Sequence, residues 1–160
     1  MPTEMLPFLW IGDYKDSMSI EFLHDKKIKV IVNCTKDIDF FYDPEFRHLK
    51  RIRLPVNDKP SVSYMDDNML MYHSVYDIVK EIHQYIINEV PVFVHCQAGK
   101  QRSATVIAAY YIMYGNVDVE TAVSYVQSKR PKCFQPKNNF KLALDKFYNH
   151  LEYTKNYKKS

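Results

Sequence analysis

The sequence predicts an α/β fold in which a central, mixed and mostly parallel sheet is covered by helices on both faces. Short β-branched runs alternate along the chain with longer helix-like segments, which is the order expected of a sheet packed between helices. The most apolar of the short runs, VFVH at 92–95, lies in the middle of the chain, as expected of a buried central strand. Ligands bind at the C-terminal ends of strands in such sheets, so we expect a site directly after this run.

The first half of the chain is expected to hold three strands and one helix. The continuous β-branched run IKVIVNC indicates a buried strand, whereas the apolar–basic alternation in LKRIRLPV is typical of a half-buried strand. Gly12 ends the first strand, and Ser17 is suited to cap the helix that follows. The expected ranges are 8–11, 28–34 and 49–56 for the strands and 18–27 for the helix.

The second half is expected to hold the central strand and four helices. The longest helix has apolar side chains three and four positions apart, as an amphipathic helix does. The helix after the central strand is largely apolar, which predicts a position at the centre of the fold. Pro131 must follow the end of the next helix. The expected ranges are 92–95 for the strand and 65–88, 103–114, 118–130 and 138–153 for the helices.

Length and composition indicate one globular domain. The chain has 160 residues, 46% of them hydrophobic and 26% charged, which excludes a disordered protein. We expect the domain to cover 1–151 and the basic segment 152–160 to form a tail that frays. The net charge of +3 is mild and by itself favours neither nucleic acid nor a membrane as partner.

The cysteines and the N-terminus indicate a reducing compartment. Cys34, Cys96 and Cys133 are odd in number and widely spaced, which is not a disulfide framework. The N-terminus lacks the basic start and long apolar run of a signal peptide, and no segment approaches 18 apolar residues. We therefore expect an intracellular, cytoplasmic protein without stable membrane association.

The stretch HCQAGKQRS, residues 95–103, joins the central strand to the next helix and carries the strongest site signal. A short loop entering a helix can turn its backbone N–H groups inward, and the helix N-terminus adds positive charge, so the loop can bind an anion. Gly99 can adopt a backbone conformation closed to other residues and so lets the loop close. Arg102 can bind two phosphate oxygens with its guanidinium. The expected phosphate-binding residues are Gln97, Ala98, Gly99, Lys100, Gln101 and Arg102.

Cys96 lies at the base of this loop and is the candidate nucleophile. The donors that bind phosphate also stabilise a thiolate, so its pKa is expected in the range of about 3.5–7.5. The Ser103 hydroxyl can donate a hydrogen bond to the sulfur and so help the thiolate leave when a cysteinyl-phosphate is hydrolysed. His95 is expected to order the loop through backbone hydrogen bonds, because an ionised nucleophile needs no base. The alternative is a buried cysteine without a chemical role, but the glycine, the arginine, the serine and the flanking strand and helix favour the nucleophile.

HCQAGKQRS resembles the signature of the cysteine-dependent protein tyrosine phosphatase superfamily. The chain from about Leu6 to Leu151 resembles its small, atypical dual-specificity branch. The resemblance implies that branch's α/β fold, a metal-independent hydrolase without a cofactor, and a shallow cleft open to phosphotyrosine, phosphoserine and phosphothreonine in protein partners. A kinase-docking domain and the N-terminal region of tyrosine-only members are expected to be absent. The other segments that carry the resemblance are LPFLWIGDYKDS, FLHDKKIKVIVNCT, LPVND and RPKCFQPKNNFKLAL.

The resemblance places the general acid at Asp58, in LPVND, and the position supports it. Asp58 follows a strand by two residues, in a proline-bracketed loop at the expected ligand edge of the sheet. It would protonate the leaving oxygen and then accept a proton from the attacking water. The alternative is a turn aspartate that caps its own backbone. Asp66 and Asp67 are the other candidates, although both are expected in the first turn of a helix, where acidic residues favour the dipole.

Two alternatives concern the substrate and the activity. A basic residue at the position of Lys100 resembles the phosphoinositide and phospholipid phosphatases of the superfamily, so a polyphosphorylated lipid or an RNA 5′ end is an alternative substrate. A solvated lysine without such a role is the simpler interpretation. An inactive phospho-binding module is the other alternative, against which the presence of Cys96, Arg102, Ser103 and Asp58 together argues.

Cys34, Lys137 and a basic cluster also bear on the site and its partners. Cys34 ends a strand expected beside that of Cys96, and some relatives hold a second cysteine there that traps the oxidised nucleophile, although a packed strand cysteine is the simpler interpretation. Lys137 stands where relatives often have Asn, which argues against a water-positioning role for its loop. A basic cluster is expected to form a solvated strand face that could attract acidic or phosphorylated partners. Its members are Arg47, Lys50, Arg51 and Arg53.

Overall fold

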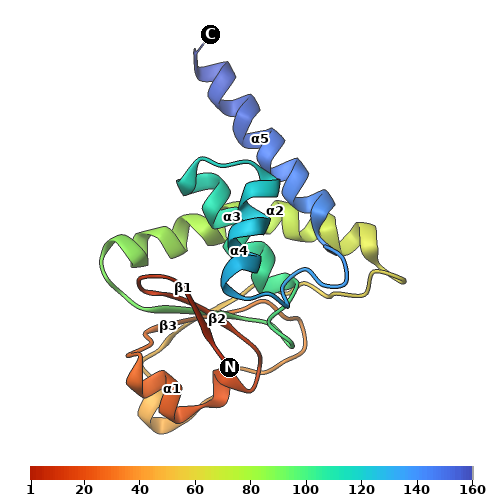
Figure 1. Cartoon of the computed structure of the whole chain (residues 1–160). Helices are drawn as coiled ribbons and strands as arrows, with labels where there is room; N and C mark the ends of the chain where they lie inside the picture. Colours follow the sequence, from red (N-terminus) through yellow and green to blue (C-terminus); the bar gives the residue numbers. More distant parts are fainter. Residues whose placement is uncertain (160) are drawn as a thin grey trace.

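The computed structural model describes residues 1–159, which form a five-stranded sheet between helices (Figure 1). The strand order is β1-β2-β5-β3-β4, with β1 antiparallel to β2 and the other neighbours parallel. The predicted mixed, mostly parallel sheet is therefore confirmed, with β5 at its centre. The strands are β1 Thr3–Leu6, β2 Leu9–Gly12, β3 Val30–Asn33, β4 Lys50–Arg53 and β5 Val92–His95.

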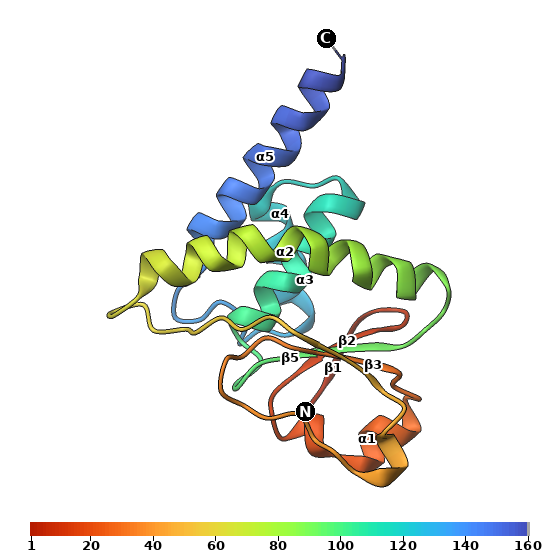
Figure 2. The same cartoon turned by 180° about the vertical axis from the view of Figure 1, so that it is seen from behind.

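The helices cover both faces of the sheet, as predicted. Figures 1 and 2 show α1 on one face and α2 to α5 on the other, with α3 in the middle of the larger layer. Every residue of α3 from Arg102 to Ile112 is buried, which explains the apolar character of this segment. The α-helices are α1 Ile20–Asp25, α2 Tyr64–Ile87, α3 Arg102–Gly115, α4 Val119–Lys129 and α5 Lys141–Lys159, and the short 3-10 helices are η1 Asp16–Met18 and η2 Pro44–Phe46.

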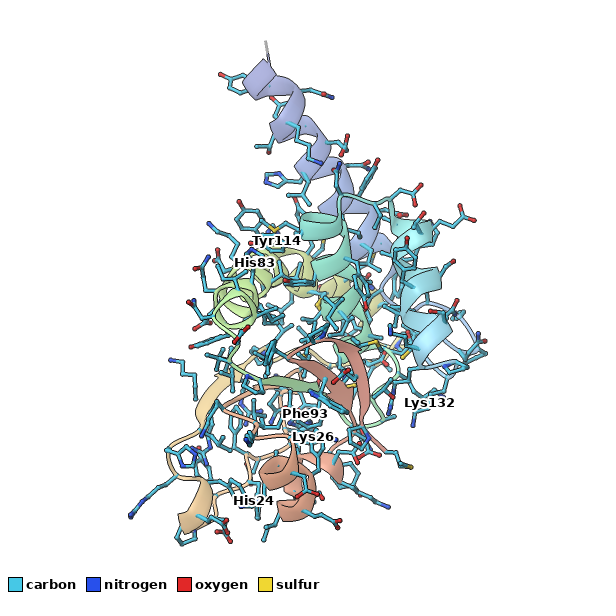
Figure 3. All side chains as sticks on the ribbon, turned by 60° about the vertical axis from the view of Figure 1, so that its left-hand side comes forward. His24, Lys26, His83, Phe93, Tyr114 and Lys132 are labelled. Atoms are coloured by element: carbon cyan, nitrogen blue, oxygen red, sulfur yellow. The ribbon has the colours of Figure 1, made fainter. Side chains whose placement is uncertain are left out.

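Aromatic side chains pack on both faces of the sheet. Phe93 of β5 points toward α1 and meets the ring of Phe22, with ring centroids 5.0 Å apart (Figure 3). On the opposite face, His83 of α2 stacks on Tyr114 of α3 with centroids 3.7 Å apart. The buried apolar residues form two clusters, one for each helical layer, so the central strand is covered on both sides. No helix within residues 1–159 has both the length and the apolar character needed to cross a membrane.

The start of the chain differs from the prediction in two respects. Strand β1 was not expected, because its four residues show no clear alternation; it forms by pairing with β2 through a tight turn in which Phe8 has a φ of 71°. The predicted cap at Ser17 is wrong. Ser17 lies in η1, where its hydroxyl donates to the Tyr14 carbonyl at 2.6 Å. Helix α1 is capped instead by Ser19, whose Oγ accepts from the Phe22 N–H at 3.2 Å.

The last helix starts later and ends later than predicted. Asn138 precedes it and accepts the Phe140 N–H at 2.9 Å, so regular helix begins at Lys141. The segment expected as a fraying tail continues α5 to Lys159, and Ser160 lies outside the described residues. Lys155 supports this extension by donating to Asn116 at 2.6 Å and Glu152 at 3.3 Å. The end of α5 projects beyond the rest of the domain (Figure 1).

The prediction that the basic cluster is solvated is wrong for two of its four members, both of which lie in β4. Arg51 and Arg53 are partly buried, and their guanidinium groups stack on Tyr42 and Phe40 at 4.3 and 4.8 Å from the ring centroids. Both arginines also donate hydrogen bonds to main-chain carbonyls, so they fix the connection between β3 and β4. The acceptor carbonyls belong to Thr35, Ile38, Phe41, Phe46 and Leu49.

Candidate active site

The loop between β5 and α3 follows the central strand at its C-terminal end. Gly99, within this loop, has a φ of 66°, in the left-handed region that favours glycine. A Cβ at this position would lie 2.7 Å from the main-chain carbon and oxygen of Gly12, at the end of the neighbouring strand β2. Both the conformation and the space therefore require glycine. The Tyr14 N–H also donates to the Gln97 carbonyl at 3.1 Å, which fixes the loop to the chain after β2.

Arg102 carries a buried donor for which the described residues offer no acceptor. Its side chain is 8% exposed, and Nη1 donates to the Val56 carbonyl at 2.9 Å. Nε has no hydrogen-bond partner among the residues that the structure describes. An unpaired buried N–H costs free energy unless a ligand accepts from it. The guanidinium is thus held in position by Val56, and its buried Nε–H is free to donate to an anion.

A pocket of about 290 Å³ opens beside this guanidinium. It brings together the predicted nucleophile, the predicted phosphate ligand and the predicted general acid, which are far apart in the sequence. The pocket is lined by Asp58, Cys96, Gln97, Ala98, Lys100, Gln101, Arg102, Gln135 and Asn139.

The Cys96 thiol is buried but surrounded by groups that stabilise its ionised form. Burial alone raises the pKa of this thiol, yet the Ser103 hydroxyl, the Arg102 charge and the N–H groups of Ser103 and Lys100 outweigh burial and lower the pKa below its usual value of 9.0. The Sγ atom lies 3.1 Å from Ser103 Oγ. The site therefore favours a thiolate, the form in which cysteine is a nucleophile.

His95 is held neutral beneath the loop. Burial is the main cause that lowers its pKa to about 4, and the Arg53 and Arg102 charges act in the same direction. Its Nδ1 lies 3.2 Å from the Cys96 carbonyl, an arrangement in which the ring donates to that carbonyl. The imidazole thus contacts the main chain of the predicted nucleophile.

Asp58 faces the pocket from the loop between β4 and α2. Burial raises its pKa above 3.8, and the nearby Asp67 adds to this, while the Asn139 amide and the Arg102 charge act in the opposite direction without cancelling it. Asn139 Nδ2 donates to Asp58 Oδ1 at 2.9 Å. A carboxyl with a raised pKa keeps its proton to higher pH, as a general acid requires.

The other acidic candidates lie elsewhere. Asp67 is buried, and its Oδ2 accepts from the Lys59 N–H at 3.2 Å and from the Ser63 hydroxyl at 2.8 Å, so it fixes the start of α2. Asp66 is exposed and lines a different surface hollow, together with residues 60–65. Neither residue lines the pocket that contains Cys96.

Comparison with known proteins identifies the family of this fold and pocket. The family described as "Dual specificity phosphatase, catalytic domain" matches residues 9–150. The chain belongs to this family. The match extends from β2 to α5, so it includes the loop, the pocket and all four residues with predicted catalytic roles.

The relatives of this phosphatase domain are distant. It is 30% identical over 150 residues to dual specificity protein phosphatase 22 of Xenopus tropicalis, a match that covers 94% of this chain and 66% of the relative. It is 29% identical to the protein phosphatase Slingshot homolog of Xenopus laevis, covering 91% of this chain and 20% of the relative. The chain therefore spans just under two thirds of the first relative and a fifth of the second.

Solved structures share the same fold. The structure of human DUSP28 superposes with a TM-score of 0.78 at 22% identity, covering 94% of this chain and 95% of that chain. The structure of a mouse putative dual specificity phosphatase complexed with zinc tungstate gives a TM-score of 0.79 at 24% identity, covering 96% of this chain and 89% of that chain. These likenesses support the architecture of the phosphatase domain.

Cys34 lies beside Cys96, the predicted nucleophile. Its N–H donates to the His95 carbonyl at 2.8 Å, so Cys34 and Cys96 are neighbours directly after the paired strands β3 and β5. Both are free thiols. Burial raises the pKa of Cys34 well above 9.0, and the nearby Cys96 adds to this. Its redox role stays a prediction.

We expect mild peroxide to give a Cys34–Cys96 disulfide detectable by mass spectrometry; stable sulfenic acid on Cys96 without this disulfide would contradict the role.

Sequence reasoning assigned no role to Arg130, which supports the predicted phosphate-binding loop, residues 96–101, called the phosphate loop. This residue is buried, and its Nε donates to the Gly99 carbonyl at 2.9 Å. Its Nη1 donates to the Met1 carbonyl at 2.6 Å and to Thr3 Oγ1 at 2.9 Å. The arginine thus joins the loop to the first strand of the sheet. Its partners are 31 to 129 positions away in the chain, so no local pattern could indicate them.

Asn139 and the side chain of Gln101 were also missed as partners. Gln101 was expected to bind phosphate through the loop, but its side chain contacts the segment before α5. Asn139 contacts Asp58 across 81 positions of sequence. The only available signal was that both residues lie in segments resembling the phosphatase family, which gives no indication that they meet.

Proposed function

We propose that this chain is a cysteine-dependent phosphomonoester phosphatase that acts on phosphotyrosine, phosphoserine and phosphothreonine in proteins through a cysteinyl-phosphate. The observation that supports this most strongly is the placement of Cys96, Arg102 and Asp58 around one pocket. Each group has the state that the reaction needs: a thiol of lowered pKa, a buried guanidinium with an unpaired N–H, and a carboxyl of raised pKa.

In the first half of the reaction the phosphoryl group moves to sulfur. The Cys96 thiolate attacks phosphorus while the bond to the leaving oxygen breaks, and the electron pair of that bond stays on the oxygen. Asp58 gives its proton to this oxygen, which leaves as an alcohol or phenol. Arg102 and the N–H groups of residues 97–102 bind the phosphoryl oxygens throughout, so they stabilise the transition state.

In the second half water releases phosphate. The Asp58 carboxylate takes a proton from a water molecule whose oxygen attacks phosphorus, and the S–P bond breaks. The electron pair returns to Cys96, where the Ser103 hydroxyl, 3.1 Å away, stabilises the departing thiolate. Inorganic phosphate leaves, and both Cys96 and Asp58 regain their starting protonation states.

The substrate class rests on the relatives and on the pocket. The relatives are named dual specificity and protein phosphatases. The pocket has a volume of about 290 Å³, and Arg102, which the Val56 carbonyl holds in position, can neutralise one phosphate group. Both observations fit a phosphomonoester. Lys100 also lines the pocket, which is the observation that keeps a polyphosphorylated lipid or RNA 5′ end as the alternative substrate.

A substrate panel tests the proposed function. We expect turnover of a small aryl phosphate and of phosphotyrosine, phosphoserine and phosphothreonine peptides, in the presence of EDTA. Phosphoinositides and 5′-triphosphorylated RNA should react more slowly than the phosphopeptides at equal concentration. Binding of phosphopeptides without any turnover would indicate the inactive phospho-binding module. Faster reaction of the phosphoinositides or the RNA would give the domain a different substrate class.

A further inference from the structure

The side chain of Gln101 connects the phosphate loop to the segment before α5. Gln101 is 7% exposed, and its Nε2 donates to the carbonyls of Lys137 at 2.8 Å and Gln135 at 3.3 Å. Its Oε1 accepts from the main-chain N–H of Asn139 at 3.0 Å. One amide thus makes three hydrogen bonds to residues 135–139. All three partners are main-chain groups, so the contacts fix the path of this segment.

Asn139 is held on its other side by α2. Asn68 Nδ2 donates to the Asn139 carbonyl at 3.0 Å, and Asn68 Oδ1 accepts from the Ala143 N–H at 3.0 Å. The start of α5 therefore lies beside the start of α2 (Figure 2). Both main-chain polar groups of Asn139 are occupied in this way. Its side chain is left to reach Asp58, to which Nδ2 donates at 2.9 Å.

We propose that Gln101 and Asn139 form an amide bridge that positions the general acid relative to the phosphate loop. The bridge runs from the loop through the Gln101 side chain to the backbone of Asn139, and from the Asn139 side chain to Asp58 Oδ1. Both residues are positioning residues that act through Asp58. This inference rests on the proposed function, because it takes Asp58 as the general acid.

The bridge also determines which carboxyl oxygen holds the proton. Oδ1 accepts a hydrogen bond from the Asn139 amide, so the proton of the neutral acid belongs on Oδ2. The bond favours the ionised carboxyl, as does the Arg102 charge from α3, whereas burial and the Asp67 charge from α2 favour the neutral form. The Asn139 side chain therefore orients the acid and limits the rise of its pKa.

Asn139→Ala tests the second half of the bridge, because it removes the bond to Asp58 and keeps both main-chain contacts. We expect kcat/KM to fall about 10-fold for phosphoserine peptides, because their alkoxide leaving group needs the acid. For 4-nitrophenyl phosphate we expect a fall of about 3-fold or less. A general acid contributes about 10²–10⁴ to the rate only where the leaving group needs a proton. The basic limb of the pH profile of kcat/KM should move to higher pH, because the variant loses a contact that lowers the Asp58 pKa.

Gln101→Met tests the first half, since methionine has a similar length and no amide. We expect the same selective loss for poor leaving groups, with the pH dependence of Cys96 alkylation by iodoacetamide unchanged. Lys137→Ala is the matched control, because Lys137 contributes its main-chain carbonyl to the bridge and its side chain is exposed. This control should keep wild-type kinetics on both ester types.

Double variants separate failure of the bridge from failure of the proposed function. In an Asp58→Asn background, Asn139→Ala should cause no further selective loss, because its effect passes through the carboxyl. Equal losses on both ester types in Asn139→Ala and Gln101→Met, or an unmoved basic limb in Asn139→Ala, would overturn the bridge. If Asp58→Asn itself lacks leaving-group dependence, the assignment of the general acid fails instead.

Discussion

Cys96→Ser is expected to abolish turnover and to keep phosphate binding. Removal of the nucleophile of an enzyme with a covalent intermediate typically lowers kcat by about 10⁴-fold or more. A serine hydroxyl cannot replace the thiolate, because neither His95 nor Asp58 can remove its proton. His95 is hydrogen-bonded to the Cys96 carbonyl, and Asp58 must stay protonated to act as the acid. The donors proposed to bind phosphate, namely the loop N–H groups and Arg102, are unchanged in this variant.

Two measurements on the same variant check this prediction. Steady-state turnover of 4-nitrophenyl phosphate reports the chemistry, and calorimetric titration with a phosphotyrosine peptide reports the binding. Cys133→Ser is the matched control, since its Sγ lies 3.6 Å from the Gly99 carbonyl behind the loop and a hydroxyl can keep this contact. Turnover of Cys96→Ser within about tenfold of wild type would be incompatible with the covalent mechanism, given the loss of about 10⁴ or more that it requires.

The three cysteines also differ in their expected reactivity. The pKa is lowered for Cys96, raised well above 9.0 for the buried Cys34, and raised by burial to about 11 for Cys133. Alkylation at neutral pH should therefore modify Cys96 first, and Cys96→Ser should remove the rapid phase. This result would show that the same thiol that carries the chemistry is the ionised one.

Features that depend on neighbours in the sequence could be predicted. The phosphate loop was found because Cys96, Gly99, Arg102 and Ser103 are almost consecutive and because an apolar strand and a helix flank them. The alternation of strands and helices predicted the layers of the fold for the same reason. The position of Asp58 at the pocket could be predicted because this residue follows a strand at the ligand edge of the sheet, where the resemblance also places the general acid.

Features that depend on tertiary contacts could not be predicted. Arg51 and Arg53 alternate with apolar residues, a pattern that fits a solvated face, yet they bind carbonyls of the preceding connection. Ser17 and Ser19 are both suited to cap a helix, and the contact of the Ser17 hydroxyl with the Tyr14 carbonyl decides between them. The bond between Asn139 and Asp58 crosses 81 positions and leaves no local trace.

Asp58→Asn is expected to slow esters with poor leaving groups by about 10²–10⁴ and to affect good leaving groups much less. A phosphoserine alkoxide cannot depart without a proton, whereas 4-nitrophenolate is stable as an anion. The measurement is kcat/KM for a series of aryl phosphates and a phosphoserine peptide, plotted against the pKa of the leaving group. The plot should be steep for Asp58→Asn and shallow for the wild-type enzyme.

The pH profile gives an independent check of the same residue. In the proposed mechanism the reactive form has an ionised Cys96 and a protonated Asp58. Activity should therefore rise as the thiol loses its proton and fall as the carboxyl loses its proton. The raised pKa of Asp58 moves this fall to higher pH than the ordinary value of 3.8 would give. Asp58→Asn cannot ionise, so its profile should keep the acidic limb and lose the basic limb.

Stability distinguishes loss of the acid from loss of the fold. Because the folded-state pKa of Asp58 is raised, ionisation of the partly buried carboxyl opposes folding at neutral pH. The neutral amide of Asp58→Asn removes this cost, and it can still accept the hydrogen bond from Asn139. We therefore expect the Tm at neutral pH to be unchanged or higher.

Asp67→Asn serves as the comparison, because Asp67 holds the start of α2 and its loss should lower the Tm. A flat leaving-group series for Asp58→Asn, beside a steep one for Asp67→Asn, would transfer the role of acid to Asp67.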